Sequence, residues 1–127
     1  MNLSGKAFKY WMDKEKLEPS QTLTIVDDLA LPLNKMRLRG SGSDAGHNGL
    51  KDIQLMLGTD VYPKLRFGIG NQFPKGGQVD FVLGKWLPGE GPVIAQKIDK
   101  SIEMIESFAA IGLDRTMTIC NALNFEI

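Results

Sequence analysis

Segments with helical and with strand-like apolar patterns alternate along the 127 residues, and this alternation is typical of an α/β fold. The segments with helical spacing are 3–17, 50–57, 92–111 and 114–123, the last with Asp114 as its N-cap. In the longest of them, the stripe expected to face the core is Ile94, Ile98, Ile102, Ile105 and Ala109. The strand-like segments are 22–26, 35–39 and 65–70, while 79–86 has no clear type. We expect one domain, residues 1–127, with a twisted, mostly parallel mixed sheet flanked by helices.

The number of strand-like segments is low for such a sheet, because sheets have about 5–6 strands on average. The segment 22–26 is apolar enough to be buried on both faces, as the central strands of parallel sheets are. With few partners it would present an unpaired edge, which is a template for association. We therefore expect that strands are missing and that the isolated chain self-associates through this edge.

Composition excludes several classes of protein. Lys plus Arg and Asp plus Glu number 15 each, so the chain cannot bind nucleic acid through its net charge, although a local basic stripe remains open. A single cysteine, Cys120, allows no intrachain disulfide, and one histidine far from it gives no metal-ligand cluster. There is no apolar run of about 20 residues and no signal-peptide pattern at the start. We expect a cytoplasmic protein without a metal or cofactor.

Five polar residues stand at the ends of the expected elements, where sites are often built. His47 begins a helix after a Gly/Ser loop, and it is either a helix-entry residue or a neutral hydrogen-bonding imidazole in a cleft. Asp27 and Asp28 follow a strand, where one of them either forms a turn or orients a base. Asn2 and Asn48 either cap helices or bind substrate through their amides.

Basic residues are concentrated around two of the expected strands. Arg37 and Arg39 are two positions apart in a strand that alternates basic and apolar residues, so they should project from the same face. The other candidates for this face are Lys51, Lys64 and Arg66. They form either an ordinary solvated surface or a surface that contacts phosphates.

Six motifs in a fixed order resemble those of the bacterial peptidyl-tRNA hydrolase family. The most specific is Gly-His-Asn-Gly-Leu-Lys at 46–51, which follows a Gly/Ser loop. The other five are Met-Asn-Leu-Ser-Gly at 1–5, Val-Asp-Asp-Leu-Ala-Leu-Pro at 26–32, Arg-Leu-Arg-Gly at 37–40, Leu-Arg-Phe-Gly-Ile-Gly at 65–70 and Val-Leu-Gly-Lys at 82–85. The family cleaves the ester between a peptide and the 3′ end of tRNA, and the resemblance implies this activity and an α/β fold.

The resemblance also implies roles for individual residues. Asp27 matches the acid that orients the family's catalytic histidine. The residues that match substrate-binding positions are Asn2, His47 and Asn48, and those expected to contact tRNA are Arg37, Arg39, Lys51 and Arg66. We expect Asn2, Asp27 and Asn48 to line one concave site, with His47 at its rim.

The chain departs from the family pattern at its start. The family's catalytic histidine and its Gly-Asn-Pro-Gly motif precede the Met-Asn-x-Ser-Gly motif with which this chain begins. We therefore expect a domain that is incomplete at its N-terminus, with little hydrolysis by this chain alone. The complete family protein is expected to be a monomer that binds peptidyl-tRNA. The alternatives are a non-catalytic relative that binds RNA or protein, and a structural α/β domain whose motifs serve packing.

Overall fold

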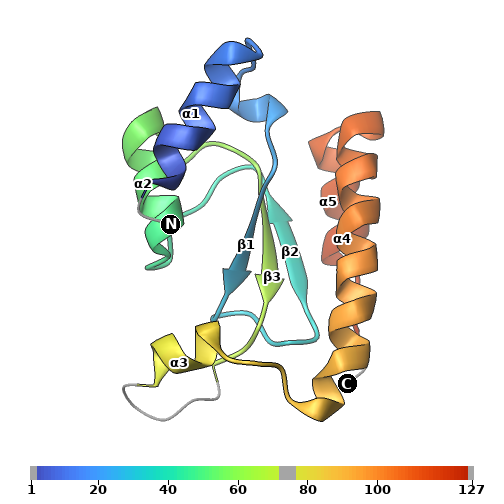
Figure 1. Ribbon diagram of the computed structural model, residues 1–127. Coiled ribbons are helices and arrows are strands. Elements are labelled where there is room, and N and C mark those ends of the chain that lie inside the picture. The colour runs from blue at the N-terminus through green and yellow to red at the C-terminus, as the bar shows by residue number, and fades with distance from the viewer. Residues whose placement is uncertain (1–2, 72–76, 126–127) are drawn as a thin grey trace. The chain divides into compact units, whose positions relative to one another are not determined.

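A computed structural model describes residues 3–71 and 77–125, and Figure 1 shows their elements. The helices are α1 (Ser4–Lys14), α2 (Asn48–Leu57), α3 (Gln78–Leu83), α4 (Gly91–Ile111) and α5 (Leu113–Asn121), with short 3-10 turns at Pro19–Gln21 and Pro88–Glu90. The strands are β1 (Thr24–Asp28), β2 (Met36–Arg39) and β3 (Lys64–Gly68). Helices and strands alternate as the sequence predicts, and the α/β class is confirmed.

The three strands form one mixed sheet in the order β1-β3-β2. The arrows in Figure 1 show β1 and β3 running in the same direction and β2 in the opposite one. The strand expected at 22–26 begins and ends two residues later, so that it includes both aspartates. Within the described chain Val26 is buried whereas Ile25 is 46% exposed, and the strand lies at an edge of the sheet. Missing strands and association through this edge remain predictions.

The contacts divide the chain into two compact units, each made of two stretches of sequence. The first unit comprises Met1–Ile25 and Arg39–Leu65, and the second comprises Val26–Leu38 and Arg66–Ile127. In the first unit α1 packs on α2 at Gly5, whose amide donates to Asp52 Oδ2 over 2.6 Å. The ring of Phe8 in α1 lies edge-on to that of the buried Tyr62, with 5.8 Å between the centroids.

In the second unit, α4 and α5 pack against the sheet through polar as well as apolar side chains. Ser101 in α4 donates to Met36 Sδ over 3.3 Å. The side-chain amide of Asn121 in α5 accepts from the amide of Leu38 over 2.8 Å and donates to its carbonyl over 3.1 Å. It thereby pairs with the β2 backbone in place of a neighbouring strand.

The buried face of α4 differs from the expected stripe. Ile98, Ile102 and Ile105 are each more than two-fifths exposed, at 50%, 51% and 44%. The buried residues of the helix are Val93, Ile94, Lys97, Ser101 and Met104. The helix is therefore rotated toward a face that includes a lysine and a serine, which apolar periodicity counts as solvent-facing. Asp114 is not the N-cap of α5 either, because that position is held by Gly112.

Candidate functional site

The carboxyl end of β1 opens onto a cavity of about 770 Å³ in the second unit. Asp27, the last residue but one of the strand, is half-buried and lies in the cavity wall. The other wall residues come from the turn after β1, from the end of β3 and from the region of α3: Leu29, Ala30, Leu31, Pro32, Leu33, Ile69, Gly70, Asn71, Asp80, Phe81, Val82, Gly84, Lys85, Trp86, Leu87 and Glu90. The cavity thus combines one predicted catalytic-site residue with a mostly apolar lining, which is typical of ligand sites.

The turn after β1 is held to the end of β3 by backbone hydrogen bonds. The amides of Ile69 and Gly70 donate to the carbonyls of Asp28 and Leu31, over 3.1 and 2.8 Å. The amide of Gly68 donates to the carbonyl of Lys35 over 3.1 Å. A Cβ atom at Gly68 would lie 2.2 Å from the Pro32 carbonyl oxygen, so only glycine allows this close approach. These contacts fix the segment that follows Asp27.

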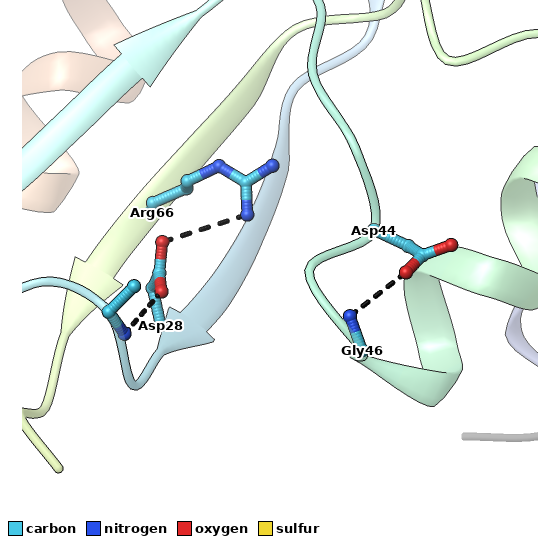
Figure 2. Close-up of polar contacts among 5 residues, drawn as sticks. Asp28, Asp44, Gly46 and Arg66 are labelled. Atoms are coloured by element: carbon cyan, nitrogen blue, oxygen red, sulfur yellow. Dashed lines mark hydrogen bonds and ion pairs between the residues drawn. The ribbon is translucent and has the colours of Figure 1, made fainter.

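Asp28, the last residue of β1, is buried and lies beside Arg66 (Figure 2). One of its oxygens accepts from the amide of Ala30 over 2.8 Å, and the other lies 3.7 Å from Arg66 Nη1. The two side chains are only 9% and 11% exposed. A phosphate would have to compete with Asp28 for this guanidinium. The tRNA contact expected for Arg66 remains a prediction.

A buried lysine lies behind the turn that follows β1. Lys97 in α4 is fully buried, and its Nζ donates to the carbonyls of Leu33 over 2.7 Å and of Gly68 over 2.5 Å. The same Nζ lies 4.0 Å from the centroid of the Phe67 ring. Burial lowers the pKa of Lys97 to about 8, so the ammonium form still predominates at pH 7.

His47 and Asn48 open α2 in the first unit. Asp44 stabilises the turn that precedes α2, because its Oδ1 accepts from the amide of Gly46 over 2.9 Å (Figure 2). His47 is the N-cap, and its Nδ1 accepts from the amide of Leu50 over 3.2 Å. A neutral ring that accepts at Nδ1 carries its proton on Nε2. In the described structure, Nδ1 of His47 is thus engaged in capping α2.

The capping role of His47 can be tested by substitution. We expect His47→Ala to lower the free energy of unfolding by about 1 kcal/mol, because the amide of Leu50 loses its acceptor. His47→Asn should retain most of the stability, since asparagine is a favourable N-cap. Urea unfolding followed by circular dichroism measures both. Equal stability of the alanine variant and the unsubstituted chain would contradict the capping role.

The remaining predicted residues are distributed as follows. Asn48 and Lys51 are exposed on α2 in the first unit. Arg37 and Arg39 are exposed at alternate positions of β2, between the buried Met36 and Leu38, which confirms that they share a face of the strand. Asn2 lies outside the described residues. The convergence of Asn2, Asp27 and Asn48 on one site remains a prediction.

The wall residues contributed by the region of α3 were not predicted from the sequence. The motif at 82–85 belongs to the resemblance but carries no expected role. The signal that could have marked it is the pair of aromatic residues that flank it, Phe81 and Trp86. Among residues 3–71 and 77–125, no group of three or more His, Cys, Asp or Glu side chains could hold a metal ion. Over the same residues, no helix has the length and apolarity needed to cross a membrane.

Comparison with known proteins decides the family. The family model described as peptidyl-tRNA hydrolase matches residues 1–126. The chain belongs to the peptidyl-tRNA hydrolase family. It is 50% identical to the peptidyl-tRNA hydrolase of Parabacteroides distasonis and 51% identical to that of Bacteroides fragilis, in each case over 95% of this chain and 65% of the relative. The chain thus spans about two-thirds of the length of these peptidyl-tRNA hydrolases.

The fold comparison agrees with the family assignment. The crystal structure of peptidyl-tRNA hydrolase from Acinetobacter baumannii is similar with a TM-score of 0.88 and 28% sequence identity. The similarity covers 98% of this chain and 63% of that one. The mixed sheet and its helices are therefore those of a peptidyl-tRNA hydrolase over the part of the fold that the chain contains.

Proposed function

We propose that the protein hydrolyses peptidyl-tRNA in the cytoplasm and that Asp27 is its catalytic-site acid. The observation that carries the proposal is the position of Asp27, in the wall of a large cavity at the carboxyl end of β1, in a chain of the peptidyl-tRNA hydrolase family. Ester hydrolysis needs a base that activates water, and a carboxylate beside a histidine holds that base in the correct tautomer. Asp27 would supply this carboxylate.

The base itself is proposed to come from outside these 127 residues. His47 is the only histidine of the chain, and its Nδ1 is already an acceptor for the helix amide of Leu50. Using His47 as a base would require breaking this N-cap. The family members compared above are longer, and their additional length would provide the histidine that Asp27 orients.

Two measurements test the proposal. The first is release of the peptide from N-acetylated aminoacyl-tRNA, by the 127-residue chain and by a form extended to the length of the family. The second is the sequence of the gene before Met1, where an in-frame Gly-Asn-Pro-Gly motif and a histidine are expected. Turnover by the extended form alone would support the proposal. Binding of peptidyl-tRNA without release of the peptide by either form would indicate a non-catalytic relative.

We further propose that β2 contributes to a tRNA-binding surface through Arg37 and Arg39, with Lys51 as a contact on α2. The two arginines are exposed on the same face of the strand, and arginine binds phosphate bidentately. Because the net charge is zero, affinity for tRNA must depend on such local groups.

Replacing Arg37 and Arg39 together with alanine should weaken tRNA binding and flatten its dependence on salt. Each lost phosphate contact reduces the slope of log K against log salt concentration by about 0.7–0.9. Fluorescence anisotropy with labelled tRNA at several salt concentrations measures this slope. The control is Lys100→Ala with Arg115→Ala, which removes the same charge from α4 and α5. An equal change of slope in both pairs would show that only net charge matters.

A further inference from the structure

Lys97 places a charged group in the buried contact of α4 with β3 and the turn after β1, which is unfavourable in free energy unless the charge is compensated. Its side chain is fully buried, and a buried ammonium loses its hydration unless protein groups replace it. The groups that replace water here are the carbonyls of Leu33 and Gly68 and the face of the Phe67 ring. The ammonium thus has two carbonyl acceptors and one aromatic face as its neighbours among the described groups.

The two carbonyls belong to the two segments that line the cavity beside Asp27. Leu33 ends the lining part of the turn after β1, and Gly68 precedes the lining residues Ile69 and Gly70. A direct chain of contacts leads from the lysine to the site. Nζ binds the carbonyl of Gly68, and the next amide, that of Ile69, donates to the carbonyl of Asp28, the neighbour of Asp27.

We propose that Lys97 is a positioning residue for the peptidyl-tRNA hydrolase reaction. Its ammonium donates to the carbonyls of both Leu33 and Gly68 and so holds these two segments together. This fixes the turn after β1 and the placement of Asp27 in the cavity wall. The inference rests on the proposed function for its catalytic consequence. Its structural consequence, a rigid wall on this side of the cavity, is independent of the reaction.

The test uses Lys97→Met, which keeps a long apolar stem and removes the donors. The matched control is Lys100→Met on the same helix, since Lys100 is 44% exposed and its Nζ is paired with Glu103 over 2.8 Å. A charged hydrogen bond stabilises the local structure against opening. Its loss should therefore accelerate amide exchange at Ile69 and Gly70 at least about tenfold. The amide of Leu50 in α2 is the internal reference, and its exchange should stay unchanged.

The kinetic readout separates positioning from a general loss of stability. In the form that hydrolyses peptidyl-tRNA, Lys97→Met should lower kcat about tenfold with KM changed by less than about twofold, because small displacements of a catalytic group affect the chemical step. Lys100→Met should leave both constants unchanged. Lys97→Gln, which keeps one donor group, should give a smaller change in the same direction and serves if the methionine variant does not fold.

The outcomes are distinct. Faster exchange confined to Ile69 and Gly70 with a lower kcat would support the proposal. Unchanged exchange and kcat in folded Lys97→Met would overturn it, and so would failure of both Lys97 variants to fold, since Lys97 would then be a general requirement for folding. If no form of the unsubstituted protein releases peptide, the proposed function has failed, and the exchange measurement alone decides whether Lys97 fixes the cavity wall.

Discussion

Replacing Asp27 with asparagine should reduce turnover of peptidyl-tRNA about 10²–10⁴-fold and leave the fold intact. Asparagine has the size of aspartate, and the half-exposed position does not require the charge for packing. It lacks the charge that stabilises a protonated histidine, and its amide nitrogen can donate to the ring where aspartate only accepts. The base would then be held in the wrong tautomer. The loss should therefore appear in kcat, measured as peptide release under saturating substrate.

The neighbouring aspartate provides the matched control for this experiment. Asp28→Asn changes the same functional group one residue along β1, but its side chain faces Arg66 in the interior. We expect it to lower the free energy of unfolding, because it leaves a buried guanidinium without its carboxylate, and to affect kcat far less. Equal losses of kcat in the two variants would mean that Asp27 has no special role.

Replacing Gly5 with alanine should produce the largest loss of stability, about 3 kcal/mol in the free energy of unfolding. A Cβ atom there would lie 2.3 Å from the carbonyl oxygen of Asp52 and 2.7 Å from Met56 Cγ. The backbone carbonyl cannot move aside unless α1 and α2 separate. The glycine of the first motif is therefore explained by the packing of two helices, with no need for a contact to substrate.

Gly91→Ala is the control for Gly5→Ala. Gly91 is the first residue of α4, has right-handed helical backbone angles and would place a Cβ with nothing within 4 Å. Alanine should leave the stability unchanged or raise it by about 0.4–1 kcal/mol, because the unfolded chain loses freedom. Urea unfolding of the two variants measures the contrast, and a Gly5→Ala protein as stable as the unsubstituted one would refute the close-packing argument.

The sequence predicted where the helices lie along the chain better than it predicted which face of a helix is buried. Apolar periodicity, together with the glycine and proline positions, located the ends of α2 and α4 to within two residues. Gly58 and Gly112 end the two helices, and Pro92 suits the first turn of α4. The buried face of α4 was mispredicted because Lys97 was counted as solvent-facing. Its burial depends on two carbonyls from residues far away in the chain, and no local pattern reports that demand.

Part of the candidate site could likewise be predicted from the sequence and part could not. Asp27 could be predicted because it stands at the end of a strand, within a motif. The cavity beside it could not, since its wall combines residues 27–33, 69–71 and 80–90, whose proximity is decided by tertiary packing. The tRNA contact expected for Arg66 came from the family resemblance, and only the structure shows Asp28 beside it.

The pairing of Asn121 with the β2 backbone has a consequence for synthesis on the ribosome. Leu38 and Asn121 are separated by 83 positions, so at about 5–20 residues per second the edge of β2 emerges about 4–17 s before the side chain that covers it. During that interval the amide and carbonyl of Leu38 can pair with any other nascent strand. Helix α5 thus covers an edge that is formed early. We expect loss of Asn121 to act mainly by raising the yield of misassembled chains, with a smaller effect on the stability of the finished fold.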